Sequence, residues 1–111
     1  MMKIILSPII TSNEADTPPS VSGNVLIYRG QQYDLSQLPD GGEVEADEPF
    51  IGLVKRVNGQ VKLVLAYRYN TNTAEPYQST DWADYTFVVE SGQCPDPIRY
   101  KPMQQEPENV D

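Results

Sequence analysis

The chain has 111 residues, a formal net charge of −8 and no histidine. That length fits one domain, and the acidic balance disfavours nucleic-acid binding, because phosphates require a positive surface. Without histidine, the chain lacks the commonest general base and the commonest metal ligand. The single cysteine, Cys94, cannot form a disulfide within one chain, which suits a reducing compartment.

Residues 2–10 are predicted to form the first strand. Pro8 suits a sheet edge or a strand end, because proline donates no ladder hydrogen bond. The apolar run here is too short for the core of a signal peptide, and no run approaches the ~20 apolar residues of a membrane span. We therefore expect a cytoplasmic protein without membrane contact. Residues 11–20 have the composition of a loop.

Residues 21–36 are predicted to form a β-hairpin. A turn at Gly30-Gln31 would be of type II′, whereas a turn at Arg29-Gly30 would shift the strand pairing by two residues. Both registers bury the same face, because a shift of two residues preserves the alternation of side chains. The buried side chains are then Leu26, Tyr28, Tyr33 and Leu35.

An acidic stretch follows, because residues 40–48 contain five acids and no base. Alternating carboxylates offer oxygen ligands to a divalent cation, but their spacing matches no EF-hand loop. We interpret the stretch as a solvated acidic loop without metal. It could also dock against the basic hairpin that follows, through surface pairs worth ~1 kcal/mol or less each.

A second hairpin is predicted around Asn58-Gly59, between apolar residues 50–57 and 61–69. A type I′ turn needs φ > 0 at both central residues, so Asn-Gly is its strongest short signal. The register pairs Phe50 with Tyr67 on the core face and sets Lys55 against Lys62 on the other. Opposed lysines are unfavourable, so that end should be solvated or meet acids from elsewhere.

The second face of this hairpin is partly apolar, through Ile51, Leu53, Val64 and Ala66. Such a face predicts either coverage by the N-terminal strand or contact between two copies of the chain.

Residues 70–84 are predicted to be an irregular connection, and residues 85–90 the last strand. The fold class is therefore all-β. We expect one small antiparallel domain, residues 1–100, built as a meander of about six strands that forms a sandwich or a partly open barrel. Residues 101–111 are expected to be a flexible acidic tail.

No residue pattern indicates catalysis, a cofactor or a metal site. Cys94 has only Arg99 nearby in sequence to activate a thiolate. Gly41-Gly42 is followed by acids, which would repel a phosphate. We therefore expect a protein that is not an enzyme and needs no cofactor.

Two groups of residues are candidates for contact with another protein. Amphipathic aromatic rings suit interfaces, and four of them lie in or beside the irregular connection: Tyr69, Tyr77, Trp82 and Tyr85. Bases at the hairpin tip could grip an anion: Lys55, Arg56 and Lys62. The alternatives are a structural role for the rings and a solvated tip for the bases.

Three blocks carry a family resemblance: MKIILSP at residues 2–8, the VLIY strand through YDLSQLPDG at residues 25–41, and VNGQVKL at residues 57–63. Together they resemble small proteins encoded in the tail and tail-fibre regions of tailed phages and prophages, over roughly residues 2–66. The chain departs from that pattern after Tyr67. The resemblance implies a bacterial host and a role near tail assembly. The family has no assigned biochemistry, so it transfers no functional residue.

We therefore expect a structural or assembly factor of a tail module, whose partner is another tail protein or a second copy of itself. Two alternatives come from other classes. One is an acidic inhibitor or DNA mimic that binds a basic host protein. The other is a small carbohydrate-binding module that uses Trp82 and the loop tyrosines.

Overall fold

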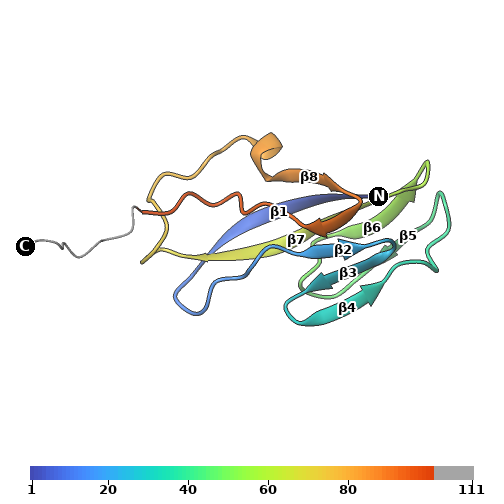
Figure 1. Ribbon diagram of the computed structural model, residues 1–111, viewed down its shortest axis with the longest axis horizontal. Coiled ribbons are helices and arrows are strands. Elements are labelled where there is room, and N and C mark those ends of the chain that lie inside the picture. The colour runs from blue at the N-terminus through green and yellow to red at the C-terminus, as the bar shows by residue number, and fades with distance from the viewer. Residues whose placement is uncertain (102–111) are drawn as a thin grey trace, which may run out of the picture.

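The computed structural model describes residues 1–101 and shows two β-sheets packed face to face (Figure 1). The large sheet has the strand order β5 (Glu43–Glu45), β6 (Leu53–Val57), β7 (Gln60–Asn70), β1 (Met2–Thr11) and β8 (Thr86–Val89). The small sheet has the order β4 (Gln31–Asp34), β3 (Val25–Tyr28), β2 (Ser20–Ser22) and β9 (Ser91–Gln93). A short 3-10 helix, η1 (Trp82–Tyr85), precedes β8. The all-β sandwich is thus confirmed.

The core lies between the two sheets, where alternate residues of the long strands are buried. The large sheet contributes Met2, Ile4 and Leu6 from β1 and Val61, Leu63, Leu65 and Tyr67 from β7. The small sheet contributes Val21, Leu26 and Tyr28. The predicted buried face of the first hairpin is confirmed, with Tyr33 and Leu35 half-buried against this core.

The strand order differs from a simple meander, because β1 lies between β7 and β8. It runs parallel to β7, with pairs from Met2–Val61 to Thr11–Asn70, and antiparallel to β8. Figure 1 shows β1 and β7 side by side through the centre of the molecule. Periodicity identifies a strand and its faces but does not say which distant strand lies beside it. β8 pairs only with residues 2–5, so Pro8 lies where β1 has a single strand neighbour.

Both hairpins turn through two residues with positive φ. Asn58 and Gly59 have φ angles of 51° and 80°, as a type I′ turn requires, and the predicted Lys55–Lys62 pair is confirmed. In the other hairpin the turn is Arg29-Gly30, with φ angles of 53° and 74°, which is the second of the two registers considered.

The register of the central hairpin changes beyond Leu53. Phe50 pairs with Leu65 rather than with Tyr67, and the Ile51 amide donates to the Val64 carbonyl at 2.9 Å. Gly52, with a φ of 75°, marks the irregularity. Glycine tolerates a positive φ, and this backbone conformation bends the strand. The predicted Phe50–Tyr67 pair is therefore wrong.

Part of the acidic stretch forms an edge strand rather than a loop. β5 pairs with β6, and Glu43 lies opposite Lys55. The predicted docking of this stretch on the basic hairpin is confirmed, but it occurs through a backbone ladder, and no ion pair joins the two in the described residues. By contrast, the N-terminal strand does not cover the second face of the hairpin, because β1 lies within the same sheet. The expected flexible tail, residues 101–111, lies outside the described residues except for Lys101.

Candidate functional site

A row of three lysines crosses the outer face of the large sheet. Lys55 on β6 is paired with Lys62 on β7, and Lys62 is paired with Lys3 on β1. Paired residues in adjacent strands point to the same face of a sheet. The side chains therefore stand side by side on the face that points away from the small sheet. Glu43 of β5 is the next residue along this row, at the sheet edge.

A shallow apolar groove of about 380 Å³ lies beside these lysines. We call the groove and its lysines the lysine groove; its lining residues are Lys3, Ile5, Ile51, Leu53, Lys55, Lys62, Leu63 and Val64. Leu53 and Ile51 are 40% and 42% exposed, so apolar surface meets solvent here. An apolar surface rimmed by charge is typical of a protein contact.

Within residues 1–101, none of the three lysines lies within ion-pair distance of a carboxylate. The ion pairs of this part of the chain join Arg29 and Arg68 to Asp16, and Arg29 to Glu48. Three ammonium groups on adjacent strands repel one another, so the row is unfavourable in the free protein. The positive row stands out on a chain whose net charge is −8.

Of the three predicted bases, Arg56 does not belong to this surface. Its side chain donates to the carbonyl oxygens of Leu38 at 2.6 Å and Leu35 at 2.9 Å, and to Asn24 Oδ1 at 3.2 Å. It is half-buried, and it holds the segment that connects β4 to β5. Its backbone lies next to the turn as predicted, but its side chain anchors that segment instead of standing beside Lys55 and Lys62.

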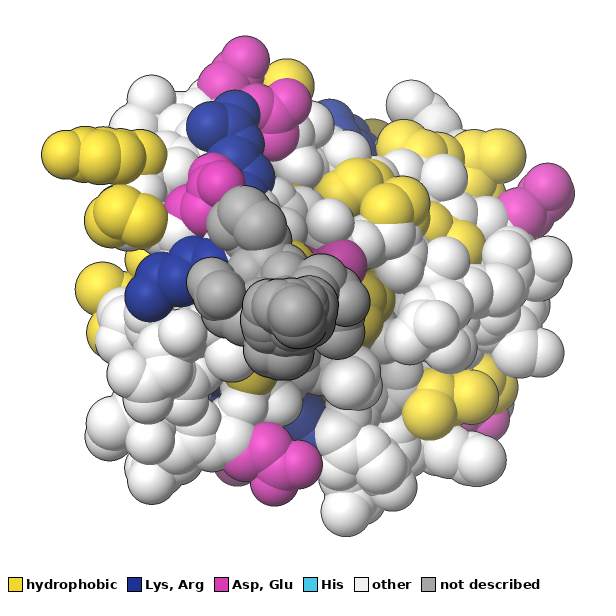
Figure 2. All heavy atoms as spheres, turned by 60° about the vertical axis from the view of Figure 1, so that its left-hand side comes forward, with side chains coloured by type: hydrophobic (Ala, Val, Ile, Leu, Met, Phe, Trp, Pro, Cys, Tyr) yellow, Lys and Arg dark blue, Asp and Glu magenta, His cyan; other side chains and the backbone are white. Residues whose placement is uncertain are grey.

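The predicted aromatic residues do not form one surface. Tyr77 and Trp82 are 83% and 57% exposed, whereas Tyr69 is half-buried. Tyr85 is only 2% exposed and donates its hydroxyl to the Ser79 carbonyl at 2.6 Å, so it is a core residue and leaves the set. The space-filling view shows hydrophobic side chains in several groups separated by polar surface (Figure 2).

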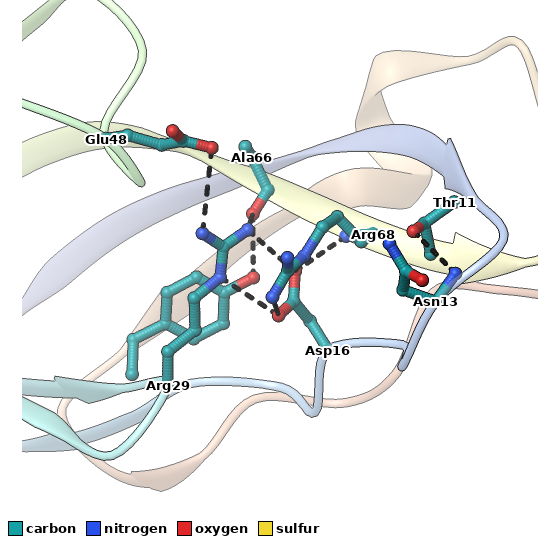
Figure 3. A network of polar contacts seen from close by, with 8 residues as sticks. Thr11, Asn13, Asp16, Arg29, Glu48, Ala66 and Arg68 are labelled. Carbon is teal, nitrogen blue, oxygen red and sulfur yellow. Dashed lines mark hydrogen bonds and ion pairs between the residues drawn. The ribbon is translucent and has the colours of Figure 1, made fainter.

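A buried carboxylate ties the two sheets together. Asp16 lies between β1 and β2, and its side chain is 3% exposed. It accepts two hydrogen bonds at 2.9 Å from Arg29, and two at 2.9 and 3.1 Å from Arg68 (Figure 3). Arg29 belongs to the β3–β4 turn of the small sheet and Arg68 to β7 of the large sheet. The cluster therefore clamps one sheet to the other.

The same cluster satisfies the nearby backbone. The Arg68 amide donates to Asp16 Oδ2 at 2.8 Å, and both Arg29 and the Tyr28 hydroxyl donate to the Ala66 carbonyl. Burial alone raises the pKa of Asp16, but the hydrogen bonds from Arg68 and Arg29 outweigh it and lower the pKa to about 2. A carboxylate so fully bonded is a poor general base. We assign this cluster to stability.

The single cysteine belongs to the core. Cys94 is buried, and burial raises the pKa of its thiol to about 11, which disfavours the thiolate. Within residues 1–101, no three acidic or cysteine side chains converge in a geometry that could hold a metal ion. No helix in that range has the length and hydropathy of a membrane span.

Sequence reasoning identified the hairpin half of the lysine groove and missed the half on β1. Lys3 and Ile5 alternate in a strand, but nothing in the local pattern placed that strand beside β7. Asp16 carried no signal either, because a single acid in a loop of Thr, Ser and Pro reads as solvated. No family model, curated protein or solved structure matches this chain.

Proposed function

We propose that this protein is a non-enzymatic component of a phage or prophage tail module that acts by binding another tail protein. The setting rests on the three resemblance blocks of the sequence. The mode of action rests on one observation of the fold: no other element of residues 1–101 packs on the outer face of the large sheet around the lysine groove. We propose that the protein works in the cytoplasm of the bacterial host.

Two further observations support a binding role over catalysis. The buried carboxylate of the described residues, Asp16, is saturated by two arginines, and the single thiol is buried. By contrast, the lysine groove offers both apolar area and unpaired charge at the surface of residues 1–101. Protein contacts are built from such surfaces, with an apolar centre and a polar rim.

The test is co-expression of this chain with the products of its neighbouring genes, followed by affinity purification and gel filtration. We expect one tail protein to elute with it as a complex of defined stoichiometry. Location outside any tail gene cluster, or no complex with any tail product, would contradict the proposal.

Carbohydrate binding is a second candidate, because one observation favours it. Trp82 is exposed beside a shallow pocket of about 200 Å³ lined by Pro8, Ser79, Thr80 and Tyr85. Sugar rings stack on exposed indoles, so binding would change the fluorescence of Trp82. No change with any member of a glycan panel would remove this candidate. The acidic-inhibitor alternative draws less support, because the charged side chains that line the lysine groove are bases and not acids.

A further inference from the structure

We infer that the lysine groove binds an amphipathic helix of a partner protein, whose carboxylates flank its apolar stripe. The inference rests on the proposed function and names the chemistry of the partner's contact. Helix-in-groove docking is a recurring way for a protein to bind a partner segment.

The first step is charge complementarity. Lys3, Lys62 and Lys55 stand on adjacent strands, and none of them forms an ion pair within the described residues, although Glu43 lies opposite Lys55 at the sheet edge. An anionic partner would neutralise their mutual repulsion and gain charge-assisted hydrogen bonds. At physiological ionic strength, salt screens the lysines from those acids of the chain that lie more than about 8 Å away, so the row can still attract an anionic partner.

The second step is spacing. Three lysines on consecutive strands span two inter-strand distances, about 10 Å in all. Helix positions i, i+4 and i+7 span about 10 Å as well, at 1.5 Å per residue. Three carboxylates on one flank of a helix can therefore each meet one lysine when the helix axis follows the row across the strands.

The third step is the apolar half of the site. Leu53, Ile51 and Val64 lie beside the row, on the same face of the sheet. A helix presents an apolar stripe and an acidic flank to one surface side by side. An extended segment with alternating side chains sends them to opposite faces instead. A nucleic acid would leave the apolar surface unpaired.

The fourth step compares a helix with other possible occupants of the lysine groove. A second copy of this chain, stacked face to face, would bring one lysine row against another, with Glu43 and Glu45 at the edge of the face. A fatty acid or lipid chain needs an enclosed site that covers most of its surface. This groove is shallow, and Leu53 stays 40% exposed in it. A helix covers the face from above, as helices cover sheets within domains.

The experiment uses a labelled synthetic helical peptide of roughly 18 residues, long enough to be partly helical alone. Its leucine stripe is flanked by three glutamates at positions i, i+4 and i+7. A matched peptide carries glutamines there. Fluorescence anisotropy measures both affinities for the full chain, and amide shifts in ¹H–¹⁵N spectra map the contact. We expect the glutamate peptide to bind about tenfold tighter, with shifts at Lys3, Lys62 and Val64.

The matched protein variants are Lys62→Gln and Lys101→Gln. Both remove one positive charge, but Lys101 lies beside Thr73, near the end of β7, far along the molecule from the row. We expect Lys62→Gln to weaken the glutamate peptide about fivefold and Lys101→Gln to leave it unchanged. Thermal unfolding checks that both variants fold.

Equal affinity for both peptides, shifts centred on Trp82, or no binding at millimolar peptide would overturn the inference. So would tighter binding of decanoate, or a dimer that Lys62→Gln dissociates. Failure of the proposed function can be distinguished from failure of the binding site. If Lys62→Gln binds its tail partner with unchanged affinity, the site is wrong but the function stands. If the peptide binds and no tail product does, the site stands without that setting.

Discussion

Lys3 lies directly opposite Lys62 across the parallel pair of β1 and β7, and Lys62 lies opposite Lys55 across the hairpin. Repulsion within this row predicts that Lys62→Gln stabilises the free protein by about 0.5 kcal/mol at low salt. The gain should shrink at high salt because exposed charges are then screened. Urea unfolding at two ionic strengths measures both effects. Lys101→Gln is the matched control, and an equal gain there would contradict this explanation.

Because Asp16 joins the two sheets, we expect removal of its charge to lower the free energy of unfolding considerably. Asp16→Asn leaves Arg29 and Arg68 without their carboxylate partner. Breaking a buried ion pair by removing one partner costs about 3 kcal/mol or more. Because the Arg68 side chain is partly exposed, we expect a loss of about 2 to 3 kcal/mol. Urea denaturation measures it. Asp47→Asn, which changes an exposed acid, should have little effect.

The depressed pKa of Asp16 predicts acid sensitivity. Its pKa falls from 3.8 in the unfolded chain to about 2 in the folded protein. The ionised carboxylate therefore stabilises the fold fully above about pH 5, and this stability is lost as the pH falls through 2. After allowance for solvent screening, the contribution is about 1 to 2 kcal/mol.

The measurement for this acid effect is the unfolding free energy of the wild type and of Asp16→Asn between pH 5 and pH 2.5. The difference between the two proteins should narrow as the pH falls. A constant difference over that range would show that Asp16 is not the titrating group.

The central turn predicts a backbone effect without any lost contact. Gly59 has a φ of 80°, and an added Cβ would meet no atom within 4 Å. Gly59→Ala should still cost about 1 to 2 kcal/mol, because a side chain disfavours the left-handed region. Asn58→Gly, at the other positive φ, should be nearly neutral. Thermal unfolding of both variants tests this, and equal melting temperatures would contradict the type I′ assignment.

Because the Cys94 thiol is buried, we expect it to react slowly with thiol reagents. Burial raises the pKa of Cys94 to about 11, so little thiolate forms near neutral pH. Reaction with a disulfide reagent such as DTNB should be slow in buffer and fast in denaturing urea. Its rate should follow the unfolded fraction through the transition. Fast labelling of the native protein would mean that the thiol is accessible.

The turn at Asn58-Gly59 illustrates what could be predicted locally. Two positive φ angles demand residues of that kind, and the pairing of Lys55 with Lys62 follows from the turn alone. The register failed only beyond Gly52, where an irregularity shifts Phe50 by two residues. Alternation does not reveal such an irregularity, because the apolar side chain keeps its face after a two-residue shift.

In the candidate site, too, some features follow from the local sequence and others only from the tertiary structure. By itself, the sequence determined an all-β chain, the buried face of each hairpin and the opposed lysines of the central one, because these depend on residues close together in the chain. Only the tertiary structure decided that β1 lies beside β7, which turns two lysines into a row of three. It alone joined Asp16 to two arginines from different sheets. Such partners are brought together by packing of the whole core, and no local pattern records them.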